Sequence, residues 1–343
     1  MSTFTRAASI VAAAAMLVTG LAACSSGGSA KADGTSSAAA CTSMENVNFG
    51  YIGDFNGTSL LAIAKDQDLW KKQCLNVTTK VFTNGPLQIT ALGSGSLDFG
   101  YIGPGALWLP AEGKAKIVAI DTFGNADRIV ALPGKGIKNV ADLKGKKVGF
   151  PQGTSGEMIL RLGLQKAGMT MSDVDAVPID PSTMVAALSS GQVDAAGFWY
   201  PALSTVKQKV PDLVELAKDS DFKKEMTFPT AFVTQQDLPT KNPKMVSRVL
   251  TVLKQANTYR FKHEDEAIKL TAAMNNLDVA AVKSDASFDQ MISTEDLVKY
   301  SKDGTVEKWL DTFGEYFVKT GTLKDPGNAS DYYTADLYAK AGN

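Results

Sequence analysis

The chain has 343 residues, of which 44% are hydrophobic and 21% charged, and its formal net charge is −1. This is the composition of an ordinary globular protein, and the length suits two domains better than one. Because the chain lacks the excess of basic residues that marks nucleic-acid-binding proteins, we expect no nucleic acid as a partner.

The first segment, residues 1–23, is predicted to be a lipoprotein signal peptide. Arg6 precedes an apolar run from Ile10 to Val18 that is too short to span a bilayer as a helix. The segment ends in Leu21-Ala22-Ala23-Cys24, which resembles the bacterial lipoprotein cleavage box, so Cys24 would become the lipidated first residue. Ordinary secretion with cleavage nearby is the alternative.

Residues 24–44 are predicted to be a flexible tether, since they are mainly Ser, Gly and Ala up to residue 40. The folded part is therefore expected on the extracytoplasmic face of the cell membrane, attached through the lipid anchor alone. Cys41 and Cys74 form an even pair in an exported chain, which predicts a disulfide, with two free thiols as the alternative. We predict neither a metal site nor a cofactor.

Expected strands and helices then alternate in two similar series. The first comprises a strand at 47–52, a helix at 58–70, a strand at 76–82, a helix ending at 92 and a strand at 97–102. The second comprises a strand at 147–150, a helix at 156–167, a strand at 174–179, a helix at 181–190 and a strand at 193–198. This alternation predicts an α/β fold with two lobes, each built on a mostly parallel sheet.

The expected lobe boundaries follow from this order. Residues 45–124 and 229–343 would form lobe I, and residues 125–228 would form lobe II, with crossings near 121–128 and 226–234. From Leu238 onward the pattern is helical without a strong strand candidate, so this part is expected to wrap lobe I. Asp98 and Asp194 occupy equivalent helix-to-strand corners and are expected to bond local backbone amides.

Ligands of parallel sheets bind beyond the carboxyl ends of the strands. Five expected loops lie there, at 53–57, 84–86, 103–105, 152–156 and 199–201. Gln152 to Gly156 follows a strand and opens a helix, so its amides and hydroxyls are predicted to seat an anion; a plain N-cap is the alternative. Trp199 and Tyr200, before Pro201, would either wall a pocket or fill the core.

Several of these residues resemble a known family. Gly85-Pro86, the run at 92–100 and Gly103-Pro104 are similar to solute-binding proteins of the taurine, alkanesulfonate and nitrate uptake class. The run at 140–149 is common to two-lobed binding proteins in general. The run at 191–202, which ends in Trp199-Tyr200-Pro201-Ala202, resembles the taurine- and sulfonate-binding branch in particular.

The resemblance implies a periplasmic-binding-protein fold of the second type, with two doubly wound lobes joined by two crossover strands. It also implies a monomeric substrate-binding component of an ABC importer, with a permease and its ATPase as partners. The expected ligand is a small organic anion, first taurine or another aliphatic sulfonate. Nitrate, a carboxylate and a pyrimidine- or flavin-type heterocycle are the alternatives.

In taurine binders a carboxylate after the first strand would neutralise the ligand ammonium, which makes Asp54 a candidate and Asp127 a second one. Members of the class tend to place this acid slightly later, where this chain has Asn56-Gly57, so the resemblance to a taurine binder is weaker here. The full set of expected ligand-binding residues is Asp54, Phe55, Asn56, Gly85, Pro86, Gly103, Pro104, Asn125, Asp127, Gly153, Thr154, Ser155, Trp199 and Tyr200.

The rival hypothesis is an enzyme. Pyrimidine-synthesising proteins of thiamine metabolism share this fold class, but their chemistry uses clustered histidines. The chain has a single histidine, His263, on a stretch rich in Lys and Glu, and no Cys–His pair or serine elbow is evident. We therefore predict a binding protein and no enzymatic activity.

Overall fold

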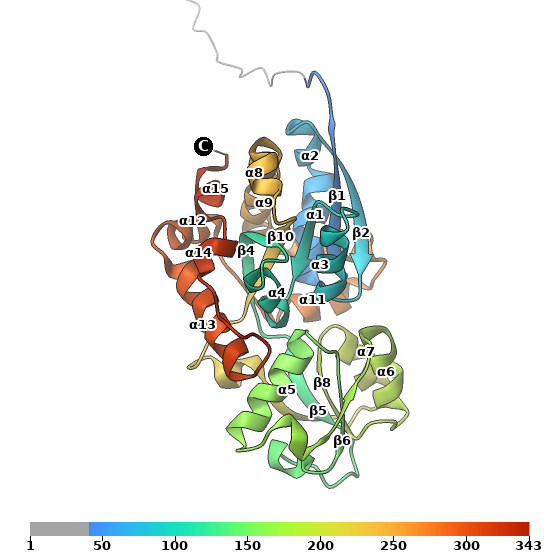
Figure 1. Ribbon diagram of the computed structural model, residues 1–343. Coiled ribbons are helices and arrows are strands. Elements are labelled where there is room, and N and C mark those ends of the chain that lie inside the picture. The colour runs from blue at the N-terminus through green and yellow to red at the C-terminus, as the bar shows by residue number, and fades with distance from the viewer. Residues whose placement is uncertain (1–40, 343) are drawn as a thin grey trace, which may run out of the picture. The chain divides into compact units, whose positions relative to one another are not determined.

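The computed structural model describes residues 41–342, and the strands of this range form two mixed sheets (Figure 1). The first sheet, of lobe I, has the order β11-β4-β10-β3-β1-β2, with β1 Glu45–Ile52, β2 Leu75–Phe82, β3 Phe99–Ile102, β4 Lys116–Gly124, β10 Pro229–Thr234 and β11 Asp289–Met291. The second sheet, of lobe II, has the order β7-β6-β8-β5-β9, with β5 Asp127–Ala131, β6 Lys147–Phe150, β7 Asp175–Pro178, β8 Ala195–Trp199 and β9 Val214–Lys218. The expected two-lobed α/β fold is confirmed.

Helices cover both sheets. Lobe I carries α1 Phe55–Asp66, α2 Leu69–Lys72, α3 Gly85–Gly93, the 3-10 turn η1 Pro104–Ala106 and α4 Trp108–Ala111. Lobe II carries α5 Ser155–Lys166, α6 Pro181–Ser189 and α7 Ala202–Lys209, with 3-10 turns η2 Val140–Leu143, η3 Met171–Asp173 and η4 Asp219–Phe222. The C-terminal part contains α8 Leu238–Lys241, α9 Pro243–Lys262, α10 Glu264–Asn275, α11 Val279–Ala286, α12 Thr294–Lys302, α13 Thr305–Lys319, α14 Ala329–Tyr332 and α15 Ala335–Lys340.

The parallel pairs lie where the βαβ pattern predicts them. β1 pairs in parallel with β2 and β3, and β6 pairs in parallel with β7 and β8, so the helices that follow start at one edge of each sheet. Phe49 on β1 is fully buried and packs against Phe99 at 5.6 Å and Phe232 at 5.9 Å between ring centroids. This aromatic contact joins three neighbouring strands of lobe I.

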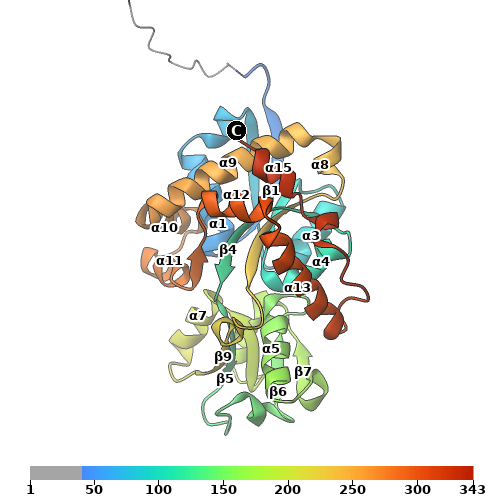
Figure 2. The same cartoon turned by 90° about the vertical axis from the view of Figure 1, so that its left-hand side faces the viewer.

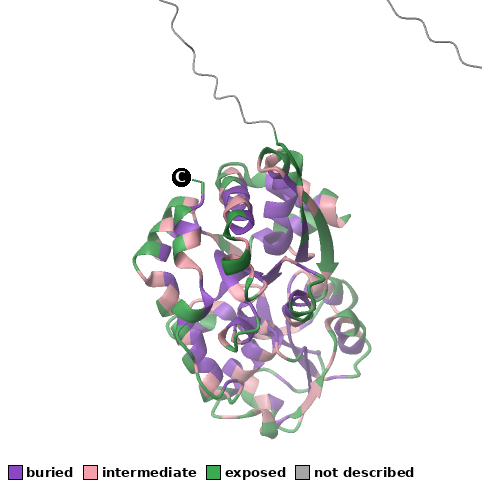
Figure 3. Cartoon of the chain, turned by 45° about the horizontal axis from the view of Figure 1, so that its top comes forward, coloured by how far each residue is buried: buried purple, intermediate pink, exposed green. Residues whose placement is uncertain are grey.

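Two sequence predictions outside the site are also met. Asp98 Oδ2 accepts a bond from the Asn48 N–H at 2.8 Å, and Asp194 Oδ2 accepts one from the Lys147 N–H at 3.1 Å, so both corners serve structure as expected. Cys41 and Cys74 are joined by a disulfide, which holds the start of the described chain against the start of β2. β2 itself is the exposed edge of its sheet (Figure 3).

The C-terminal part packs on lobe I but departs from the expectation in two ways. α9 and α10 lie against α1 as predicted (Figure 2), and Arg260 of α9 forms a fully buried ion pair with Asp121 at 2.5 Å. The expectation of no strand is wrong, because β11 pairs with β4. α13 also reaches lobe II, where the Tyr316 hydroxyl donates to the Met158 carbonyl at 3.2 Å.

The lobes meet backbone to backbone at Gly105 of η1. A Cβ added to Gly105 would overlap the backbone of Thr154 and Ser155, at the start of α5 in the other lobe. Only glycine allows so close an approach. The absence of a side chain at Gly105 therefore determines how closely the two lobes approach each other.

We expect Gly105→Ala to hold the lobes apart. Overpacking of this kind costs about 1–3 kcal/mol, so solute affinity should fall by about five- to hundredfold and the radius of gyration from X-ray scattering should rise. Gly93→Ala is the matched control, because an added Cβ there has nothing within 4 Å. An unchanged radius of gyration in Gly105→Ala would contradict the contact.

Candidate functional site

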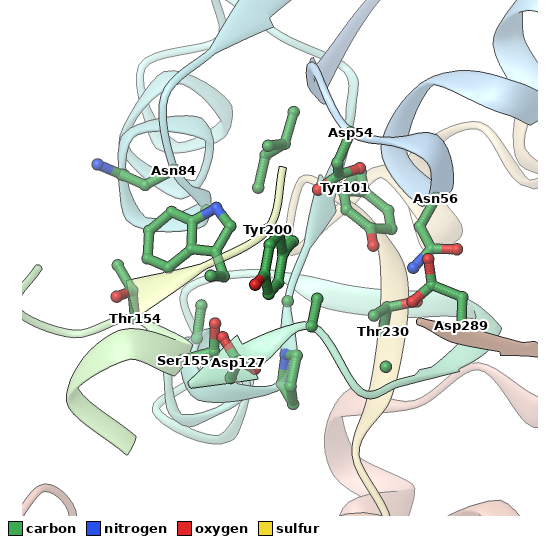
Figure 4. Close-up of a pocket in the computed structure, with 18 of the residues that line it drawn as sticks. Asp54, Asn56, Asn84, Tyr101, Asp127, Thr154, Ser155, Tyr200, Thr230 and Asp289 are labelled. Atoms are coloured by element: carbon green, nitrogen blue, oxygen red, sulfur yellow. The ribbon is translucent and has the colours of Figure 1, made fainter. Parts of the chain in front are cut away.

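A cavity of about 60 Å³ lies between the lobes, at the carboxyl ends of the strands (Figure 4). Both lobes and the crossing between β4 and β5 line it. The lining residues are Ile52, Asp54, Asn56, Asn84, Gly85, Pro86, Tyr101, Gly103, Pro104, Ala106, Gly124, Ala126, Asp127, Thr154, Ser155, Trp199, Tyr200, Thr230, Asp285 and Asp289. At about 30 Å³ for each water, a volume of this size holds about two waters, so the closed form leaves room only for a compact solute.

Three helices begin at this cavity, and the residue that caps each one lines it. Asp54 Oδ1 accepts from the Gly57 N–H at 2.6 Å at the start of α1, and Asn84 Oδ1 accepts from the Leu87 N–H at 3.0 Å at the start of α3. Thr154 Oγ1 accepts from the Gly156 N–H at 3.2 Å at the start of α5. Helix N-termini carry partial positive charge, which offsets part of the acidity described next.

One wall of the cavity is acidic. Asp54, the N-cap of α1, lines it together with Asp285 of α11 and Asp289 of β11, and Asp285 Oδ2 accepts from the Phe55 N–H at 2.7 Å. Burial, and then the charge of Asp285, raises the pKa of both Asp54 and Asp289 well above the ordinary value. Burial raises the pKa of Asp285 to about 7. Like charges without water favour protonation or a bound cation.

A fourth carboxylate comes from lobe II. Asp127, the first residue of β5, is 5% exposed, and burial raises its pKa to about 6, although a hydrogen bond with the Ser155 side chain opposes this. The Asp127 N–H donates to Asp219 Oδ2 at 2.9 Å, which fixes the backbone at the crossing. The lining includes no Arg, Lys or His, so these carboxylates have no basic partner within the cavity.

Three acceptor atoms at the cavity have no hydrogen-bond partner. Asn56 Oδ1 and Asp289 Oδ1 belong to lobe I and Asp127 Oδ1 to lobe II, and Asn56 and Asp127 are more than nine-tenths buried. Figure 4 shows Asn56 and Asp127 on opposite sides of the cavity. Because a buried polar atom without a partner costs about 1–3 kcal/mol, Asn56 calls for a ligand donor, and Asp127 calls for a donor when ionised or an acceptor when protonated.

Aromatic residues close the cavity on the lobe II side. Trp199 and Tyr200 line it at the end of β8, and the Tyr200 ring stacks on Phe288 at 4.4 Å between centroids. Arg128 lies over the rings of Tyr200 and Phe288 and forms an ion pair with Glu215 at 3.0 Å. Arg128 therefore supports the aromatic wall from behind and does not line the cavity.

The predicted anion seat at the start of α5 is occupied by the protein itself. The Gly153 N–H donates to Glu157 Oε2 at 2.7 Å, and the Gly156 N–H donates to Thr154. Gly105 covers Ser155 from the other lobe. Thr154 is the N-cap, which was the alternative to the anion seat, and it also lines the cavity.

The structure brings most predicted site residues together. Those that line the cavity are Asp54, Asn56, Gly85, Pro86, Gly103, Pro104, Asp127, Thr154, Ser155, Trp199 and Tyr200. Phe55, Asn125 and Gly153 do not line it. Phe55, the first residue of α1, is buried in the core. Asn125 Oδ1 accepts from the Ser220 N–H at 3.0 Å, so Asn125 ties the two crossings together.

Sequence reasoning missed Asn84, Tyr101, Thr230, Asp285 and Asp289. Asn84 had a usable signal, because an Asn directly before Gly85-Pro86 is a typical N-cap. Tyr101 and Thr230 lie within the buried strands β3 and β10, where a sequence pattern does not separate residues of the core from residues of the site. Asp289 had no local signal, because β11 is too short to show strand periodicity, and Asp285 lies on α11, whose position at the cavity no local pattern shows.

Within the described range no helix is long and apolar enough to cross a bilayer. The same range holds no cluster of three or more His, Cys, Asp or Glu residues suited to a metal ion. The predicted signal peptide and lipidation at Cys24 lie outside the described residues.

Comparison with known proteins places the chain in a family. The model of the "NMT1/THI5 like" family matches residues 56–267, and the chain is 49% identical over 292 residues to the "Putative binding protein" of Brucella abortus strain 2308, covering 85% of this chain and 91% of that protein. The chain belongs to the NMT1/THI5-like family.

Two more distant relatives are named for sulfonate binding. The "Putative aliphatic sulfonates-binding protein" of Escherichia coli K12 is 27% identical over 256 residues, with 73% of this chain and 78% of that protein covered. The structure of the alkanesulfonate-binding protein SsuA from Xanthomonas axonopodis pv. citri, bound to MOPS, superposes with a TM-score of 0.68 at 24% identity, over 85% of this chain and 99% of that one. The fold of this family member is thus the periplasmic-binding-protein fold.

The acidic wall predicts how stability depends on pH. Asp127 and Asp285 keep protons in the native state up to about pH 6 and 7, whereas the unfolded groups release them near 3.8. Between these limits the native state binds more protons, so the free energy of unfolding should fall as pH rises. Asp285→Asn, which keeps an acceptor for Phe55, should reduce this fall.

Urea unfolding at about pH 5 and about pH 8 measures the effect, which should be a few kcal/mol in the unliganded wild type. The exposed Asp212→Asn variant is the control and should keep the full slope. A wild-type stability that rises with pH, or a slope that Asp285→Asn leaves unchanged, would contradict the assignment.

Proposed function

We propose that this family member is the extracytoplasmic substrate-binding component of an ABC import system. The observation that carries the proposal is the cavity between two lobes, with buried polar atoms from both that have no partner within the protein. Each lobe supplies part of the lining, so a solute satisfies both only when they meet at Gly105, and binding shifts the population toward that state. The permease and its ATPase would act on this closed form.

We infer that the solute is a small amino-sulfonate, with taurine as the first candidate. Its ammonium group would lie at Asp54, Asp285 and Asp289, where burial makes a cation favourable. Its sulfonate would face the opposite side, near Asn84 and Thr154, where α3 and α5 begin with partial positive charge; the Gly153 and Gly156 amides are already paired, so α5 would contribute its end charge and not those donors. Asp127, when protonated, would donate to the sulfonate, because a nearby anion raises its pKa further.

The acidic wall disfavours the other anions considered from the sequence. Nitrate, a simple carboxylate or a plain alkanesulfonate would bring negative charge to a cavity without Arg, Lys or His and would leave Asn56 Oδ1 without a donor. A pyrimidine-type heterocycle with amino groups is the second candidate, because it offers donors to Asn56 and Asp127 and a flat face to Trp199. The absence of His and Cys from the lining supports binding over catalysis.

The Asp54→Asn variant tests the ammonium site. Asn is an equally good N-cap, so α1 keeps its start while the charge is removed. Taurine affinity from titration calorimetry should fall about ten- to hundredfold, the value of a charged hydrogen bond, whereas ethanesulfonate should lose nothing. Asp66→Asn at the exposed end of α1 is the control. Equal losses for both ligands would overturn the ammonium role.

A further inference from the structure

A second, larger cavity adjoins the first. Its volume is about 470 Å³, and it lies between α11 of lobe I and α6 and α7 of lobe II. Ile52, Asp54, Trp199 and Asp285 line both cavities, so they form a shared wall between an inner chamber and this outer chamber. Two of the carboxylates proposed to bind the ammonium thus stand at the boundary.

The outer chamber is mainly apolar. Its apolar lining residues are Ile52, Phe82, Pro181, Phe198, Trp199, Pro201, Ala202, Leu277, Ala281 and Val282. Large hydrophobic side chains that are exposed also gather at its rim. Leu277 is 44% exposed, and Val81, which is 59% exposed, would lie 3.7 Å from a Cβ added to Gly53 in the lining. Exposed apolar groups beside a pocket mark a binding surface.

We propose that the outer chamber is a subsite for an apolar substituent on the nitrogen of the solute. This inference rests on the amino-sulfonate function proposed above. An ammonium held by Asp54 and Asp285 lies in the shared wall. One substituent of the nitrogen would therefore extend into the inner chamber and another into the outer chamber. The inner chamber has room for only about two waters and cannot also hold a bulky substituent. The preferred substrates are therefore N-substituted taurines.

The structure also explains why the substituent should be apolar. Asp54 and Asp285 need the N–H donors of a secondary ammonium. The further charged residue of the outer lining, Asp278, accepts from the Ala280 N–H at 2.8 Å as the cap of α11, and Phe198 and Val282 offer a second polar group nothing to bond. Burial of each methylene in such a chamber increases affinity by about fourfold. A substituent the size of a cyclohexyl ring should therefore increase affinity at least about tenfold, even when it is partly exposed.

Titration calorimetry with taurine, N-methyltaurine and N-cyclohexyltaurine (CHES) at neutral pH in phosphate buffer tests the proposal with the full chain. We expect affinity to rise in that order, with CHES at least about tenfold tighter than taurine. If taurine binds and CHES binds equally or more weakly, the subsite is wrong and the outer chamber is an open mouth or a surface for the importer. If none of the three binds, the amino-sulfonate function itself fails.

Chamber-filling variants locate the substituent. Ala281→Trp on α11 should bring the ratio of CHES to taurine affinity down toward one, because the indole would occupy the chamber. Ala280→Trp is the matched control, since Ala280 is an exposed neighbour on the same helix that does not line the chamber, and it should keep the ratio. Thr205→Trp fills the chamber from α7 and serves if Ala281→Trp fails to fold. A ratio that neither filling variant reduces would overturn the proposal.

Discussion

Buried carboxylates without a basic partner are the constraint on which the lobe junction depends. Lobe I neutralises Asp121 with Arg260 in a fully buried ion pair, but it leaves Asp54, Asp285 and Asp289 together at the cavity with no such partner. Burial raises the pKa of each, so closing the site without a cation favours the protonated carboxyls. A solute that brings a positive charge removes this penalty, which links ligand chemistry to the closing of the lobes.

The contact between the two lobes includes a glycine and a pair of stacked aromatic rings. Gly105 lets η1 meet the start of α5 without a side chain between them, and the stack of Tyr200 on Phe288 joins the lobes through two rings. Arg128 covers both rings and ties them to Glu215. None of these groups needs to bind the solute, yet together they set the distance at which the acceptors of the two lobes face each other.

Much of the site was predictable because it depends on local rules. Asp54 and Thr154 cap helices that follow parallel strands, and such caps always lie at the carboxyl edge of the sheet. The same reasoning placed Trp199 at the end of β8. It failed for Gly153, whose N–H bonds Glu157 one turn later, because a sequence does not show which donor a backbone amide will find first.

The sequence by itself determined the two α/β lobes, the pairing of Cys41 with Cys74 as an expectation, and the loops that meet at the cavity, since each follows from short-range periodicity and turn chemistry. Only the tertiary structure decided the electrostatics. Asp289 reaches the cavity because β11 pairs with β4, and Asp285 comes with it on α11. Charge at a site is a sum over residues that are distant in the chain, so local pattern alone predicted the anion seat at the start of α5 but not the acidic wall that α11 and β11 bring to the same cavity.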